Sequence, residues 1–101
     1  MSSNLLGELV ANNGTYYLQG VESDYIGNVD QVIVRGNGVV SFQLFITVDG
    51  ELEDVSSEYS KDGSDTKMPT ATRITPIGNN VFTRIRIKFS SDDCGLELVL
   101  A

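Results

Sequence analysis

The residues best suited to chemistry in this 101-residue chain are carboxylates, and they gather in one segment. The segment 49–65 has a net charge of −6, from Asp49, Glu51, Glu53, Asp54, Glu58, Asp62 and Asp65 against Lys61. Glycoside hydrolysis uses a pair of carboxylates, and Glu51, Glu53, Asp54 and Glu58 are the candidates for such a pair. A chain of this length leaves little room for a deep cleft, and it has no tryptophan to stack on a sugar ring. We therefore expect no enzyme activity.

Other catalytic and metal chemistry is limited by the lack of histidine. The chain has no histidine, and Cys94 is its only cysteine. The usual serine and cysteine relays need a histidine, and the usual zinc sites need histidine or paired cysteines, so both classes are excluded. A single cysteine also excludes an internal disulfide and is typical of a reducing compartment. We interpret Cys94 as a small residue in a turn.

The acidic segment leaves two ligand-binding alternatives open. Calcium takes several carboxylate or carbonyl oxygens, which the acids of 49–65 could supply. The spacing of Asp62 and Asp65 matches no calcium loop, because the alternating acids and the distal glutamate of an EF-hand are missing. A carbohydrate patch is the other alternative, with Tyr16, Tyr17, Tyr25 or Tyr59 as its aromatic residues. We expect neither a cofactor nor a metal, and interpret the segment as a solvated edge and loop.

The charge reverses in the next segment. Residues 66–91 carry +5 and no acid, from Lys67, Arg73, Arg84, Arg86 and Lys88. Segments of opposite sign can pair within the fold, between copies of the chain, or against a larger charged surface. The net charge of the whole chain is −7. Because phosphate-backbone binding is driven by basic residues, nucleic acid is not expected as a partner.

The elements that must position these charges are strands. In residues 81–89, Val81, Thr83, Ile85, Ile87 and Phe89 alternate with Phe82, Arg84, Arg86 and Lys88. This two-residue period predicts a strand with one apolar and one cationic face. Residues 39–48 alternate in the same way, with Phe45 on the face opposite the apolar side chains. We expect a partner contact at Phe45, Phe82, Arg84, Arg86 and Lys88, because arginine and aromatic side chains contribute most to interface energy.

The remaining pattern predicts a fold built of strands alone. We predict strands at 5–11, 15–21, 29–35, 39–48, 51–55, 71–77, 81–89 and 96–100. Segment 22–28 is predicted as a loop and segment 56–69 as the longest surface excursion. Across the last predicted hairpin, Glu97 would neutralise Arg86 or Lys88. The sequence thus predicts an all-β single domain of residues 1–101, an antiparallel β-sandwich or compact barrel of about seven to eight short strands.

Membrane insertion and export are not expected from the sequence. No apolar run approaches the ~20 residues that span a bilayer. The start Met1-Ser2-Ser3 lacks the basic and apolar layout of a signal peptide.

A short, acidic, turn-rich all-β chain that begins Met1-Ser2-Ser3 and ends in the strand Leu96 to Ala101 resembles small bacteriophage virion proteins of the head decoration or cement type. The similarity covers the whole chain, in composition and strand pattern and without a motif. It implies a structural module that clamps neighbouring capsid subunits, with copies of itself and the major capsid protein as partners. The virion, assembled in the host cytoplasm, is the implied location. The alternatives are a calcium- or carbohydrate-binding module and a small inhibitor or accessory subunit of a host enzyme.

Overall fold

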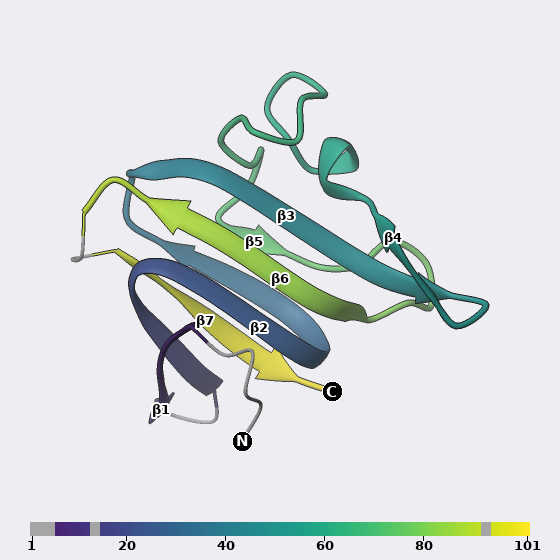
Figure 1. The fold of residues 1–101 in the computed structure, drawn as a ribbon, viewed down its shortest axis with the longest axis horizontal. Helices are drawn as coiled ribbons and strands as arrows, with labels where there is room; N and C mark the ends of the chain where they lie inside the picture. Colours follow the sequence, from purple (N-terminus) through teal and green to yellow (C-terminus); the bar gives the residue numbers. More distant parts are fainter. Residues whose placement is uncertain (1–5, 13–14, 92–93) are drawn as a thin grey trace.

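The computed structural model describes residues 6–12, 15–91 and 94–101. They form one curled antiparallel sheet of seven strands, in which β1-β2-β6-β3-β4 are neighbours and β5 and β7 pair with β2 (Figure 1). The strands are β1 (Leu6–Asn12), β2 (Thr15–Arg35), β3 (Val39–Val48), β4 (Glu51–Asp54), β5 (Arg73–Ile74), β6 (Phe82–Phe89) and β7 (Gly95–Leu100), and a short 3-10 helix, η1 (Ser56–Glu58), follows β4. The predicted all-β antiparallel fold is confirmed.

Strand β2 organises the sheet. Its 21 residues double back twice, as Figure 1 shows. Its ladders are irregular between Gln19 and Asp24 and again between Ile26 and Val29. The segments 16–19 and 29–35 both pair with β7 and therefore lie on its two sides, whereas 22–29 pairs with β6. The sheet thus has two halves, one around β7 and one formed by β6, β3 and β4. Each half contains part of β2, so the turns of β2 place the two halves face to face.

The prediction that residues 22–28 form a loop is wrong. Glu22 to Ile26 pair with β6 in continuous antiparallel register. The segment lacks the apolar alternation of a half-buried strand, because Glu22 and Asp24 occupy one of its faces. That face lies opposite basic residues of β6. The acids that make this segment look like a loop in the sequence are thus paired with bases in the fold.

Most other strands lie within two residues of their predicted ends. The predicted strand 71–77 shrinks to two residues, Arg73–Ile74, which pair with β2. Pro76, two residues after Ile74, has no N–H to donate to a ladder. The predicted last hairpin is also wrong, because the pairings of β7 among the described residues are all with β2.

The core lies between the two facing halves of the sheet. Its buried members include Val29, Val32, Val34, Phe42, Leu44, Ile74, Ile85, Ile87, Phe89, Leu96 and Leu98. The run Val32-Ile33-Val34, predicted to be covered on both sides, is buried at all three positions. Burying one such side chain contributes about 1.5 to 3 kcal/mol, so this set is the main stabilising feature of the fold.

Phe82 belongs to this core, and its predicted place on the cationic face is wrong. Its exposed fraction is 0%, and its ring meets Tyr59 edge to face with the centroids 5.5 Å apart. Ile85 is buried as well, so the alternation of β6 slips by one residue between Phe82 and Ile85. This change lies opposite the irregularity of β2 between Ile26 and Val29. There β2 has one residue more than β6, which shifts the alternation of side chains between the two faces.

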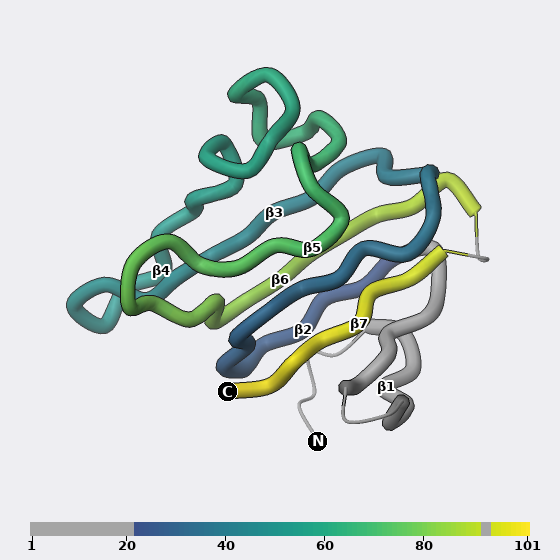
Figure 2. Tube along the Cα trace, turned by 180° about the vertical axis from the view of Figure 1, so that it is seen from behind, coloured from purple at the N-terminus to yellow at the C-terminus, as the bar shows by residue number. Residues whose placement is uncertain are grey.

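The excursion between β4 and β5 is the longest connection, as predicted, and stands away from the sheet (Figure 2). Ser60 and Pro69 form a bridge at its base. The Thr70 N–H donates to the Tyr59 carbonyl at 2.8 Å, and the Tyr59 hydroxyl accepts from the Ile77 N–H at 3.0 Å. Tyr59 therefore fastens the excursion both to the core and to the segment that precedes β6.

We expect Phe82→Ala to lower the free energy of unfolding by about 3 to 5 kcal/mol, the usual cost of truncating a fully buried phenylalanine. Phe45→Ala, which removes a half-buried ring of β3, should cost about 1 kcal/mol. Urea denaturation of both variants measures the difference. Equal and small losses would show that Phe82 is not a core residue.

Stability should fall in alkaline solution because of Tyr59. Burial raises the pKa of its hydroxyl; the hydrogen bond from Ile77 acts against this, and the charge of Glu58 adds to it. The unfolded chain thus loses this proton at a lower pH than the folded chain. The stabilisation that comes from the protonated hydroxyl is therefore complete below about pH 10, and it is lost as the pH rises through the folded pKa. Melting temperatures at rising pH should fall more steeply for the native chain than for Tyr59→Phe. A steeper fall for the variant would contradict this assignment.

Candidate functional site

The candidate functional site is the side of the sheet that faces away from the core across β2, β6, β3 and β4, here called the outer face. Antiparallel register sets its residues in rows, because directly opposite positions are immediate neighbours. One row contains Ile26, Arg84, Phe45 and Asp54; the next contains Asp24, Arg86 and Gln43; the third contains Glu22, Lys88 and Ser41. Acidic, basic and apolar residues of four strands therefore meet on one surface.

Asp24 lies at the β2 end of the second row and contacts two arginines of β6. Arg84 donates from Nε to Oδ1 at 3.1 Å and from Nη2 to Oδ2 at 2.9 Å, a bidentate pair. Arg86 Nε lies 3.6 Å from Oδ2 of the same carboxylate. Asp24 is only 7% exposed. The side-chain hydrogen bond to Asp24 raises the pKa of Arg84, which favours its charged guanidinium.

Hydrogen bonds extend from this pair to the end of β4. Arg86 Nη1 donates to Gln43 Oε1 at 3.3 Å, and Gln43 Nε2 donates to Asp54 Oδ2 at 3.4 Å. The other oxygen of Asp54 accepts from the Ser56 N–H at 2.9 Å. Ser56 is buried, and its hydroxyl accepts from the Leu44 N–H at 2.8 Å. This series of contacts, here called the polar row, connects side chains of four strands.

Four of the five residues predicted to contact a partner lie together on the outer face. Arg86 and Lys88 are exposed, Arg84 and Phe45 are half-buried, and Phe82 alone lies elsewhere. Arg86 and Lys88 also line a shallow hollow, together with Glu22, Ser41 and Gln43. The accessible residues of the outer face thus include the cations Arg86 and Lys88, the acids Glu22 and Asp54, and the apolar side chains Ile26 and Phe45.

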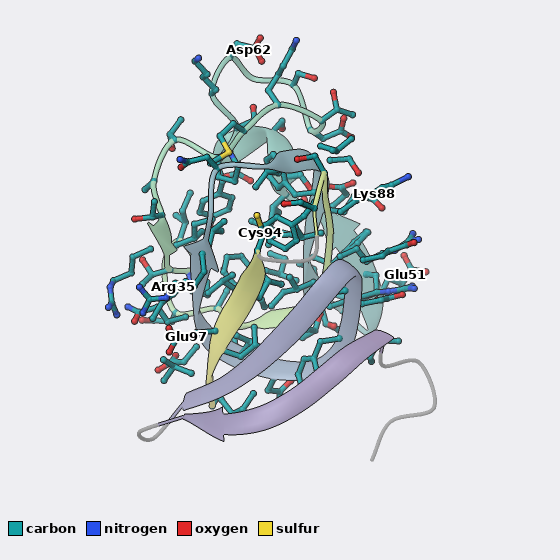
Figure 3. The ribbon with its side chains drawn as sticks, turned by 90° about the vertical axis from the view of Figure 1, so that its left-hand side faces the viewer. Arg35, Glu51, Asp62, Lys88, Cys94 and Glu97 are labelled. Carbon is teal, nitrogen blue, oxygen red and sulfur yellow. The ribbon has the colours of Figure 1, made fainter. Side chains whose placement is uncertain are left out.

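Glu97 does not neutralise Arg86 or Lys88, and that expectation is wrong. Glu97 pairs with Arg35, on the side of the molecule opposite Lys88 (Figure 3). The cause is topological, since β7 lies beside β2 and not beside β6. Asp24 takes the role expected of Glu97. Sequence reasoning missed it because it lies in the segment predicted as a loop, which lacks the apolar alternation of a strand.

The acids of segment 49–65 lie in the turn before β4, on β4, on η1 and in the excursion, and they are exposed. Glu51 to Asp54 are all exposed along β4. Across residues 6–12, 15–91 and 94–101, no group of three or more His, Cys, Asp or Glu residues could hold a metal ion. The aromatic candidates are also scattered: Tyr25 packs on the core, Tyr59 fastens the excursion, and the side chains of Tyr16 and Tyr17 are outside the described set.

The part of the chain that the structure describes contains no helix long and apolar enough to cross a membrane. Comparisons with protein-family models, with curated proteins and with solved structures find no match to the chain. Function is therefore inferred from the geometry of the outer face.

Removal of Arg84 should destabilise the fold, because Asp24 would remain buried without its bidentate partner. We expect Arg84→Ala to lower the free energy of unfolding by about 2 kcal/mol, as is typical of hydrogen bonds to charged groups. Lys88→Ala, at an exposed position, should change it by about 0.5 kcal/mol or less. A double-mutant cycle of Asp24→Asn with Arg84→Ala measures the coupling. Strictly additive effects would show that the pair does not stabilise the fold.

Proposed function

We propose that the chain is a non-catalytic interaction module whose outer face binds another protein. The polar row is the observation that carries this proposal. It joins Asp24 to Arg86 by an ion pair of 3.6 Å, and Arg86 to Gln43 by a hydrogen bond of 3.3 Å. Ordering these side chains in the free protein reduces the entropy that a partner must take from them on binding. Phe45 and Ile26 lie beside the row and add the apolar contact.

The exposed charges indicate the chemistry of the partner. Arg86 and Lys88 present cations along β6, with Glu22 of β2 opposite Lys88, whereas Asp54 presents an acid at the β4 end. A complementary surface carries carboxylates opposite Arg86 and Lys88 and an apolar side chain opposite Phe45. Arg84 is held by Asp24, so it supports the surface from within and contributes less direct contact.

Within this class, the chain fits a structural component of a bacteriophage particle, of the head decoration or cement type. Its partners would then be further copies of itself and the major capsid protein, in a virion assembled in the host cytoplasm. Three properties support this choice: the small all-β fold, the acidic composition, and the large apolar side chains that are exposed at Ile26, Val40, Val48, Leu52 and Ile77. Of these, Ile26 and Leu52 lie on the outer face, in register with Arg84 and Thr47, respectively.

Sedimentation with capsids tests the proposal. The purified chain is mixed with capsids assembled from the major capsid protein of the same genome, and the pellet is assayed for bound chain. We expect saturable binding, and binding at least about tenfold weaker for the double variant Phe45→Ser with Lys88→Glu, since each 1.4 kcal/mol of lost contact is one factor of ten. Lost apolar contact and reversed charge both act against association.

The matched control makes the same charge change outside the outer face. Lys67→Glu reverses an exposed lysine of the excursion and should bind as the native chain does. Thermal unfolding establishes that all variants are folded. The proposal fails if the native chain stays in the supernatant, or if the outer-face variant and the control bind equally well.

A further inference from the structure

Strand β4 is an uncovered edge of the sheet. It is the last strand in the order β1-β2-β6-β3-β4, and among the described residues it pairs with β3 alone. All four of its residues are exposed, with Leu52 at 52%. Edge strands carry unpaired main-chain groups and are usually covered, twisted away or blunted. Strand β4 is short and carries three acids, which protect it against acidic strands, so a strand that adds at this edge has to be basic.

The turn before β4 fixes which of its main-chain groups face outward. Asp49 and Gly50 have φ of 52° and 81°, as a two-residue type I′ turn requires, so the flanking pair Val48 and Glu51 is hydrogen-bonded. Such pairs alternate along an antiparallel ladder.

The same alternation reaches the end of β4, where the Val55 N–H donates to the Leu44 carbonyl at 2.9 Å. Glu51, Glu53 and Val55 therefore direct their main-chain groups toward β3. The N–H and C=O groups of Leu52 and Asp54 point away from the sheet, where an added strand would meet them.

The two faces of β4 differ in chemistry. Glu53 lies opposite Ile46 and shares its core-facing side, whereas Leu52 and Asp54 share the outer face. On the core-facing side, Glu53 and Glu58 border a hollow. Its other lining residues are Ile46, Val55, Tyr59, Ile77 and Asn80, so none of the described lining residues is basic. A lysine stem would lie on the apolar residues of this hollow while its ammonium group reaches the carboxylates.

We propose that β4 accepts an extended segment of another protein as an added strand, and that this segment alternates lysine or arginine with apolar residues. Its basic side chains face Glu51 and Glu53, its apolar side chains face Leu52, and its main chain bonds to Leu52 and Asp54. This inference concerns the sheet edge and does not depend on binding at the outer face.

A second copy of the chain is a poorer occupant than a basic segment. Two antiparallel β4 edges that pair through Leu52 would bring Glu51 of each copy opposite Glu53 of the other, and like charges directly opposite are destabilising. The chain's own strand with alternating basic and apolar residues is β6, which lies between β2 and β3 and cannot be donated. The short strand β5 has only two residues, Arg73 and Ile74.

A synthetic seven-residue peptide of alternating lysine and valine, capped at both ends, tests the proposal. Amide hydrogen exchange of the full chain is followed by NMR with and without the peptide. We expect saturable binding and at least about tenfold slower exchange at Leu52 and Asp54, because their N–H groups become hydrogen-bonded. The Glu51 and Glu53 amides, already bonded to β3, should change little. An acidic peptide of alternating glutamate and valine should not bind.

Variants separate the main-chain and charge contributions. Leu52→Pro removes an outward N–H without touching the β3 ladder and should weaken peptide binding at least about tenfold, whereas Leu52→Thr keeps the N–H and should bind nearly as the native chain does. Glu53→Gln should weaken binding and reduce its salt dependence. Asp62→Asn makes the same charge change in the excursion and should have no effect. Thermal unfolding shows whether each variant is folded.

Several results would overturn the proposal. These are no saturable binding of the basic peptide, binding without slower exchange at Leu52 and Asp54, or equal binding by Leu52→Pro and Leu52→Thr. A concentration-dependent dimer of the chain that Leu52→Pro abolishes would make a second copy the occupant instead. The double variant Phe45→Ser with Lys88→Glu should bind the peptide normally, so failure of the outer-face proposal and failure at this edge are distinguishable.

Discussion

The path of β2 is the constraint on which the rest of the structure depends. Because 16–19 and 29–35 lie on the two sides of β7 while 22–29 lies beside β6, one strand holds both halves of the sheet in register. The halves cannot separate without breaking ladders on this strand. The apolar side chains of β3, β6 and β7 are thereby enclosed, and the opposite side of β3 and β6 is left as a broad polar surface.

Asp24 connects the path of β2 with the outer face. It belongs to the middle segment of β2, and its carboxylate lies on the outer face beside the arginines of β6. Its carboxylate holds Arg84 in a bidentate pair and draws in Arg86. The same contacts that satisfy a nearly buried acid therefore order the basic side chains. Two basic residues of β6 thus have different roles. Arg84 stabilises the fold through its pair with Asp24, and Lys88 is accessible to a partner. At the other end of the polar row, Asp54 joins the outer face to the edge strand β4.

The sequence was most informative where local pattern decides structure. Strand 39–48 is confirmed at both ends, because its apolar alternation stops at the Asp49-Gly50 turn. The shared face of Arg84 and Lys88 follows from the same period. Other features depend on contacts far apart in the sequence. Asp24 and Arg84 are 60 positions apart, and the inward turn of Phe82 depends on an irregularity in its neighbour β2, so neither is visible in the local alternation.

The central claim is that the outer face is a protein contact, and it is tested most directly by an electron cryo-microscopy map of the chain on its capsid. Partner density should cover the outer face, with carboxylates near Lys88 and Arg86 and an apolar side chain against Phe45. A map in which the chain is bound through another surface, with Lys88 and Phe45 facing solvent, would contradict the account.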